Sequence, residues 1–317
     1  MSYRKVIKMP ESLSPADYIT PLYMNGLHGR VLQTPMPKRR KREILFVYGH
    51  HASLERQFGL IELLSKYGAV TMPDLPGFGG MESFYKIGEK PTLDNLADYL
   101  AAFVKLKYKR KRVTIVAMSF GFAVVTRMLQ RCPDLVKKVD LLISLVGFVH
   151  HEDFHMKRHN FLMLRYTASL VSRRLPAIFM RYAVLNKYVI TATYRLLADK
   201  HTKLKDAERE EQNRRILFEI GLWQDNDVRT WADTGITMFT LDLCKKQVDL
   251  PVYHVMVDKD RYFDNDLVEQ HMNVVFNKVT LIKSIMPDHA PTVVASEAEA
   301  APFVPPKVRR LLAQRLR

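Results

Sequence analysis

The sequence predicts an α/β fold with a mostly parallel central sheet, helices on both faces and an inserted helical lid. Short runs of apolar residues, typical of strands buried on both faces, alternate with segments of helical periodicity. This alternation favours a parallel sheet covered by helices. It stops at about residue 150, gives way to an almost entirely helical pattern, and resumes near residue 244. A chain of 317 residues fits one such domain with an insertion better than two equal domains.

Composition divides the chain into three parts. The predicted α/β core comprises residues 1–150 and 244–295, and the helical lid is the insertion at 151–243. Beyond Ala295 the composition shifts to ASEAEAAPFVPP, typical of a linker, and the chain ends in the basic amphipathic segment KVRRLLAQRLR. We therefore predict a linker and a basic C-terminal tail at 296–317.

The predicted elements follow in chain order. Two peripheral strands, 3–9 and 27–34, are bounded by Pro and Gly. A basic loop leads to the strand ILFVY, and the helix after it ends at Gly68. The strand that begins at Ala69 runs into the tight turn PDLPGFG. A helix with Thr92 as its N-cap precedes the most informative stretch. The later strands are 139–148, 250–257 and 278–286, with a helix before the last of them.

The most informative stretch of the chain is VTIVAMSFGFAVVTRMLQRCP, residues 113–133. A buried strand turns through AMSFG into an apolar helix, which is the setting of a nucleophile elbow. Small neighbours allow the crowded turn to raise Ser119 above the sheet, although Ala117 stands where the motif has its first Gly. The positive end of the following helix points at any oxyanion formed there. An ordinary buried strand–helix turn is the alternative interpretation.

A serine hydroxyl needs a base to take its proton and a third group to orient that base. Elbow architectures place an acid after a late strand and a histidine after the last one. Asp260 and His289 occupy those places, in the order Ser–Asp–His. Asp258 and Asp264 are rivals for the acid. We predict the catalytic residues Ser119, Asp260 and His289.

With these residues, the sequence resembles the α/β-hydrolase superfamily over roughly 25–150 and 245–295. The matching pieces are LFVYGHH, PDLPGFG, AMSFG, VDKDRYF and DHAP, and they are similar to the lidded serine esterase and lipase-like branch. This branch also contains C–C hydrolases, epoxide hydrolases and dehalogenases. The last two classes use an aspartate nucleophile, so Ser119 argues against both.

The resemblance implies an oxyanion hole made by the backbone N–H groups of His50 and Phe120. Tyr48 stands where the family usually has His, and Val257 where it usually has Gly before the acid. The implied function is a serine hydrolase that cleaves a carboxylic ester through an acyl-enzyme, without a cofactor. A thioester or C–C substrate stays open within the fold. The rival is a non-catalytic member of the fold that binds an anionic membrane surface or nucleic acid.

Composition bears on location and metal binding. Two cysteines give no disulfide framework and suggest a reducing compartment, and the N-terminus lacks the apolar region of a signal peptide. We therefore expect a soluble, cytoplasmic protein, with peripheral contact to the inner face of the membrane as an additional hypothesis. We predict no metal site, because the adjacent His50 and His51 face different ways. The oligomeric state is left open, and no specific nucleic-acid motif is found.

The net charge of +16 favours anionic partners. Basic clusters precede several strands, notably Lys38–Arg42 and Lys107–Arg112, so a basic band should lie at the sheet edge opposite the site. Between Phe154 and Ala198 there is no acidic residue. Eight cations alternate there with apolar residues: Lys157, Arg158, Arg165, Arg173, Arg174, Arg181, Lys187 and Arg195. The pattern fits a lipid-facing surface or, equally, a buried apolar face with solvated arginines opposite.

Overall fold

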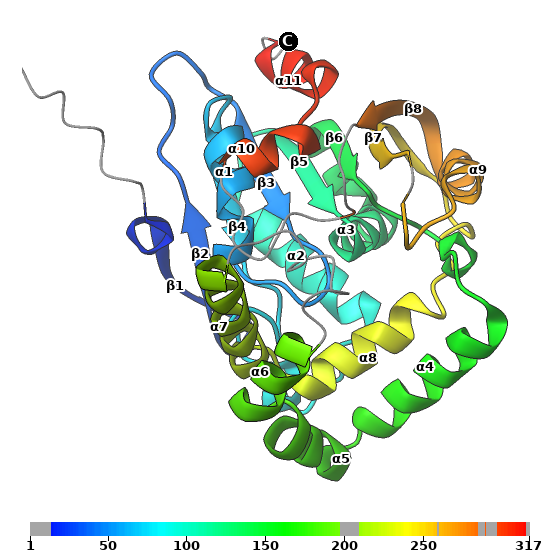
Figure 1. Cartoon of the computed structure of the whole chain (residues 1–317). Helices are drawn as coiled ribbons and strands as arrows, with labels where there is room; N and C mark the ends of the chain where they lie inside the picture. Colours follow the sequence, from blue (N-terminus) through cyan, green and yellow to red (C-terminus); the bar gives the residue numbers. More distant parts are fainter. Residues whose placement is uncertain (1–13, 197–208, 259, 285–288, 290–296, 315–317) are drawn as a thin grey trace, which may run out of the picture.

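The structure is a computed structural model that describes residues 14–196, 209–258, 260–284, 289 and 297–314. One eight-stranded sheet has the order β1-β2-β4-β3-β5-β6-β7-β8 (Figure 1). β1 and β2 pair antiparallel, as do β2 and β4, and every other neighbouring pair is parallel. The strands are β1 (Ile19–Met24), β2 (Leu27–Gln33), β3 (Glu43–Val47), β4 (Ala69–Pro73), β5 (Val113–Met118), β6 (Val139–Leu145), β7 (Val248–Val257) and β8 (Phe276–Ser284). The predicted α/β class with a mostly parallel sheet is confirmed.

The centre of the sheet is buried, as the apolar runs indicate. All six residues of β5 are buried, and ten of the twelve residues of the helix behind it are buried as well. Thr92 caps its helix by accepting a hydrogen bond from the Asn95 amide at 3.1 Å, as predicted. The helices outside the lid are α1 (Phe58–Ser65), α2 (Leu93–Lys107), α3 (Phe120–Arg131), α9 (Asn265–Val275), α10 (Glu297–Ala300) and α11 (Pro306–Ala313).

The N-terminal edge differs from the prediction. Strand 3–9 lies outside the described residues, and the partner of β2 is instead β1, which the sequence analysis missed. The two strands form a hairpin through Asn25 and Gly26, whose φ angles are 53° and 78°. Positive φ at both central residues is the type I′ geometry that Asn-Gly favours. Pro21 is tolerated in β1 because this strand lies at the edge of the sheet.

Between β6 and β7 the described elements are all helical. They are α4 (Arg158–Val171), α5 (Arg174–Phe179), a π-helical turn (Met180–Val184), α6 (Lys187–Leu196), α7 (Arg209–Asp225) and α8 (Val228–Met238), with a short 3-10 turn (His151–Asp153) before them. Two small apolar clusters hold them together: one joins Val171 and Ala177 to α8, the other joins Ile190 to α7. None of the helices in the described ranges has the length and apolar character needed to cross a bilayer.

The C-terminal segment packs on the core, where a linker and tail were expected. Phe303, Val304, Val308 and Leu312 are all buried in the main apolar cluster. Val308 and Leu312 lie one turn apart on the same face of α11, and that face is covered by the protein itself. The segment that was predicted as a basic amphipathic tail thus contains a helix, and its apolar face packs on the α/β core.

Arg42, from the predicted basic band, holds this segment in place. Its guanidinium donates to the Leu312 carbonyl at 3.1 Å and the Gln314 carbonyl at 2.9 Å, and to the hydroxyl of Thr114. It also lies 3.7 Å from the Asp140 carboxylate, and both side chains are buried. Burial lowers the pKa of Arg42, against the opposing effect of Asp140. At least this member of the basic cluster therefore has a structural role.

Candidate active site

The turn between β5 and α3 has the geometry of a nucleophile elbow. Ser119 has φ 48° and ψ −124°, a conformation that L-residues rarely adopt and that persists only where the surroundings impose it. Gly121 is required by packing, since a Cβ there would lie 2.2 Å from the Tyr48 carbonyl oxygen. Ala117 is fully buried at the end of β5, so its methyl group is accommodated where the motif has glycine.

The structure brings together the three residues predicted for catalysis. His289 Nε2 lies 3.1 Å from Ser119 Oγ, and His289 Nδ1 lies 2.6 Å from Asp260 Oδ2. A carboxylate only accepts hydrogen bonds, so Nδ1–H donates to Asp260 and Nε2 accepts from the Ser119 hydroxyl. Both His289 and the Asp260 carboxylate are nearly buried. The geometry is that of a hydroxyl, a base and an orienting acid.

Asp260 is held as a carboxylate. Burial alone would raise its pKa, but the hydrogen bond and charge of His289 oppose this. The amides of Tyr262 and Phe263 donate to its other oxygen at 2.8 and 3.2 Å, and the pKa of Asp260 is lowered below its ordinary value. An ionised acid here is suited to stabilise an imidazolium.

The two rival carboxylates have other partners. Asp258 is exposed and lies 3.5 Å from the Lys283 ammonium. Asp264 caps α9, where its Oδ1 accepts from the amides of Asp266 at 3.0 Å and Leu267 at 3.3 Å. Neither has a recorded contact with His289 among the described residues.

The predicted oxyanion-hole residues flank Ser119. Phe120 begins α3, so its amide belongs to the positive end of that helix. His50 follows Gly49, which lies so close to Ser119 that a Cβ on Gly49 would be 3.1 Å from the Ser119 Cβ. The oxyanion hole itself stays a prediction, carried by the closeness of both residues to Ser119.

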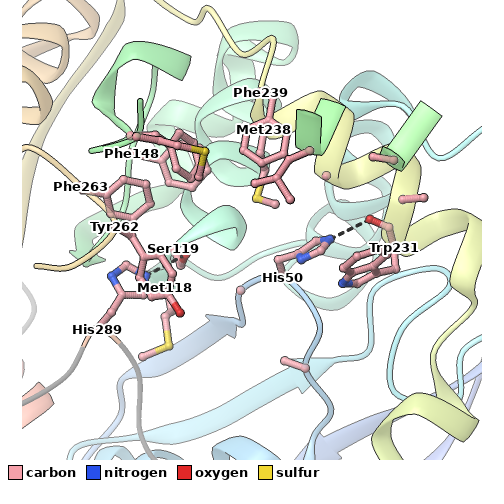
Figure 2. A pocket seen from close by; sticks show the side chains of 18 of the residues that line it. His50, Met118, Ser119, Phe148, Trp231, Met238, Phe239, Tyr262, Phe263 and His289 are labelled. Carbon is pink, nitrogen blue, oxygen red and sulfur yellow. Dashed lines mark hydrogen bonds between the residues drawn. The ribbon is translucent and has the colours of Figure 1, made fainter. Parts of the chain in front are cut away.

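The His50 side chain has a role that the sequence analysis missed. Its Nε2 lies 3.0 Å from the Trp231 carbonyl on α8 (Figure 2). The hydroxyl of Thr234, on the same helix, lies 2.9 Å from the same nitrogen. Burial, with a smaller effect from the charge of His51, lowers the pKa of His50 to about 3, so the ring is neutral and Nε2–H donates. The loop that carries the predicted oxyanion donor is thereby hydrogen-bonded to the lid.

Tyr48, which replaces the family's usual histidine, is fully buried at the end of β3. Its hydroxyl donates to Asp74 Oδ1 at 3.0 Å and accepts from the Leu75 amide at 2.7 Å. It thus joins the oxyanion loop to the PDLPGFG turn. Val257 stands where the family usually has Gly before the acid. It is the last residue of β7 and pairs with Ser284 of β8.

A cavity of about 450 Å³ lies above Ser119 and His289 (Figure 2). The loops after the strands contribute Phe148, Phe154 and Phe263, whereas α4 and α8 of the lid contribute further apolar side chains. The lid side chains that line it include Leu164, Ala168, Val171, Trp231, Met238 and Phe239. Its volume is in the range of small-molecule sites. The sequence predicted a site beneath the lid but not these individual lining residues.

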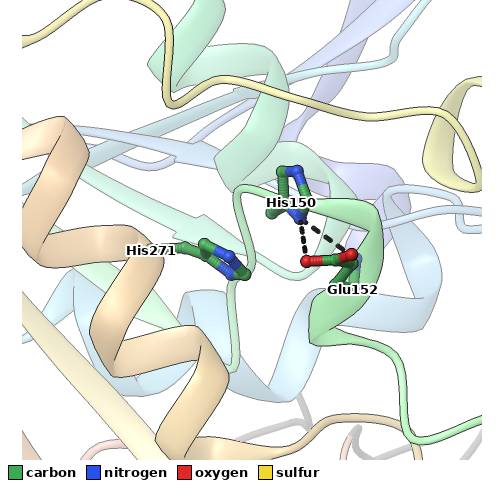
Figure 3. Close-up of side chains that lie close together, drawn as sticks. All are labelled: His150, Glu152 and His271. Atoms are coloured by element: carbon green, nitrogen blue, oxygen red, sulfur yellow. Dashed lines mark hydrogen bonds and ion pairs between the residues drawn. The ribbon is translucent and has the colours of Figure 1, made fainter.

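A second cluster of titratable groups lies outside this cavity. His150, Glu152 and His271 have candidate ligand atoms within 4.8 Å of one another, a set that could hold a divalent metal ion (Figure 3). Two of its members already have hydrogen-bond partners. His271 Nδ1 lies 2.5 Å from the buried Asp153 carboxylate, and His150 Nδ1 accepts from the Glu152 amide. These contacts join α9 to the loop that leads into the lid. His50 and His51 do face different ways, because His51 Nδ1 lies 3.0 Å from the Asn226 side chain.

An eight-stranded, mostly parallel sheet with a serine at its strand–helix elbow and a helical insertion defines the α/β hydrolase architecture. The family model described as "alpha/beta hydrolase fold" matches residues 43–291, and the chain belongs to this family. Comparison with curated protein sequences finds no match.

Solved structures of several hydrolases have the same fold. A thermophilic esterase from Thermogutta terrifontis is 15% identical, covers 93% of this chain and 98% of its own, and has a TM-score of 0.59. The enol-lactonase of Burkholderia xenovorans LB400 is 13% identical, covers 93% and 100%, and has a TM-score of 0.62. A mutant epoxide hydrolase from Bacillus megaterium is 13% identical, covers 92% and 98%, and has a TM-score of 0.63. At these identities the likeness is one of fold.

Proposed function

We propose that the protein is a serine hydrolase that cleaves carboxylic esters with an apolar acyl group. The observation that carries this proposal is the hydrogen-bonded series Ser119–His289–Asp260 at the base of an apolar cavity. Serine as the elbow residue favours acyl transfer over the epoxide and dehalogenation chemistry of the fold, which requires a carboxylate nucleophile.

In this mechanism Ser119 Oγ attacks the acyl carbonyl while His289 Nε2 takes its proton. Asp260 holds the ring in the required tautomer and stabilises the imidazolium. The amides of His50 and Phe120 stabilise the tetrahedral oxyanion. His289 then returns the proton to the departing alcohol, and water hydrolyses the acyl-enzyme by the same steps.

Labelling with a fluorophosphonate probe tests the proposal, because the probe reacts only with an activated serine. We expect stoichiometric labelling of the wild type, complete loss of labelling in Ser119→Ala, and full labelling in Ser172→Ala, which changes a lid serine outside the cavity. An unlabelled wild-type protein would instead support the non-catalytic alternative, a member of the fold that binds anionic membrane or nucleic acid.

The cavity also predicts an effect on acyl-chain length. Gly235 lines the cavity from α8, and a Cβ built there meets nothing within 4 Å, so Gly235→Phe should fit the helix and fill cavity space. We expect the ratio of kcat/KM for p-nitrophenyl octanoate to that for the acetate to fall about tenfold or more, because several methylene contacts are lost.

Gly221 on α7 provides a matched control for that change. It has equally open space for a side chain but does not line the cavity. Gly221→Phe should leave the ratio unchanged. If Gly235→Phe also left it unchanged, the acyl group would bind elsewhere.

A further inference from the structure

The lid exposes an unusual concentration of apolar side chains, all but one of them (Leu164) outside the lining of the cavity. Of the nineteen large apolar side chains that are exposed in the described part of the chain, twelve lie between residues 162 and 196. They are Leu162, Met163, Leu164, Tyr166, Leu170, Leu175, Ile178, Phe179, Tyr182, Tyr188, Val189 and Leu196. Concentrations of this kind mark interaction surfaces.

The lid's own packing leaves these side chains uncovered. Among residues 159–171 of α4 only Ala168 and Val171 are buried, and on α5 only Ala177. Leu175 and Phe179, by contrast, are 77% and 67% exposed. The buried apolar face of these helices is therefore small, and most of their large apolar side chains are exposed.

Cations share this outer face. Arg165, Arg173, Arg174 and Lys187 are exposed on or between the same helices, and no acidic residue occurs from Phe154 to Ala198. Among the described residues no ion pair is recorded for these four cations. Figure 1 shows α4, α5 and α6 at the end of the molecule farthest from α11, with α8 between α4 and the sheet.

We propose that this outer lid face, formed by α4, α5 and α6, docks on an anionic lipid surface. Apolar side chains interleaved with cations are what the boundary of a bilayer accommodates, because the apolar groups enter the acyl region while the cations reach headgroup phosphates. Three of the exposed side chains are tyrosines (Tyr166, Tyr182 and Tyr188), whose rings favour the headgroup level.

Charge favours an anionic lipid surface over a second copy of the chain as the partner of this face. In a symmetric dimer the same patch faces itself, so Arg173 and Arg174 would meet other cations without any acidic residue of the segment to pair with. An anionic bilayer neutralises the cations and covers the apolar side chains together. The described part of the C-terminal tail lies at the opposite end of the molecule, so the proposal concerns the lid alone (Figure 1).

Docking would bring lipid close to the cavity. α4 exposes Tyr166 and Leu170 outward, while its Leu164, Ala168 and Val171 line the cavity. One helix therefore separates the docking face from the space above Ser119. Delivery of a lipid acyl ester to that space rests on the proposed function, whereas docking itself does not.

The test is co-sedimentation of full-length protein with phosphatidylcholine vesicles, with and without phosphatidylglycerol, at low and high salt. The protein carries Ser119→Ala, so that no lipid is consumed and the result does not depend on catalysis. We expect preference for the anionic vesicles, reduced by salt. Changing Arg165, Arg173 and Arg174 together to Gln should weaken binding about 100-fold, since each cation near an anionic leaflet contributes about fivefold.

The matched control changes the exposed Lys109, Arg110 and Lys137 to Gln, which removes the same charge at another surface. It should bind like the parent protein. A second variant carries Leu175→Gln and Phe179→Gln. At high salt its affinity for the anionic vesicles should be about tenfold or more below that of the parent protein. Thermal melting verifies that each variant is folded.

Three results would overturn the proposal. Equal binding to both vesicle types is one, and equal weakening by the lid and control charge variants is another. The third is the absence of vesicle binding together with self-association that Leu175→Gln and Phe179→Gln abolish, which would assign the face to a second copy. Failed fluorophosphonate labelling with intact vesicle binding would refute the proposed function only.

Discussion

Replacing Ser119 or His289 with alanine is expected to lower the hydrolysis of a p-nitrophenyl ester by roughly 10³-fold or more, with the fold intact. Ser119→Ala removes the attacking oxygen, and His289→Ala removes the group that lies 3.1 Å from it and accepts its proton. The measurement is kcat/KM of purified variants, with circular dichroism as the check on folding. Wild-type activity in Ser119→Ala would show that another group performs the reaction.

Neighbouring carboxylates give this prediction its internal control. Asp260→Asn should lower activity strongly but less than loss of the serine, because the amide can no longer stabilise an imidazolium. Asp258→Asn affects an exposed residue, and Asp264→Asn retains a good N-cap, so both should stay near wild type. Greater loss in either of these than in Asp260→Asn would assign the acid to that residue.

Arg42→Ala is expected to destabilise the protein by about 3–5 kcal/mol, the cost typical of breaking a buried ion pair from one side. The substitution leaves the Asp140 carboxylate buried without its cation and frees the carbonyls of Leu312 and Gln314. Loss of these contacts should also release α11 from the core. Urea denaturation measures the change in the free energy of unfolding.

Lys41→Ala is the matched control, since Lys41 is the adjacent basic residue and is exposed. It should change the stability by less than about 0.5 kcal/mol. The double variant Arg42→Met with Asp140→Leu should recover much of the loss, because no unpaired charge remains. If Arg42→Ala were as stable as Lys41→Ala, the buried Arg42–Asp140 pair would contribute little to the free energy of unfolding.

The sheet could be predicted from sequence because its central strands are continuous apolar runs. The β5–α3 elbow is local as well, since Ser119 and the small Gly121 belong to one turn. Strand order then indicated Asp260 and His289, because parallel strands end at the same edge. The β1 hairpin was missed although Asn25-Gly26 signals it, since Pro21 weakens the strand pattern.

The remaining features depend on contacts between distant segments. The pattern of α11 predicts an apolar face but not that Arg42, about 270 residues earlier, binds its end. Periodicity could not decide whether the apolar residues of the lid point inward or outward, because both faces of α4 carry them. Sequence order indicated Asp260 but left Asp258 and Asp264 as rivals, since only the folded position of His289 shows which carboxylate it contacts.

The hydrogen bonds of His50 to α8 have a consequence for how a substrate enters. α8 is also fastened to the core by Asp227, whose amide donates to the Gly77 carbonyl, and by Arg229, which stacks on Tyr85. Moving α8 outward would break the hydrogen bonds of His50 Nε2 to Trp231 and Thr234 and so disturb the loop that carries one of the proposed oxyanion donors. Because Val171 of α4 packs on Val228 and Ala232 of α8, a displacement of α4 would reach the same helix. The position of the lid helices over the cavity and the geometry of the proposed oxyanion loop are therefore linked through α8, so a substitution that loosens α8 should lower kcat as well as change substrate binding.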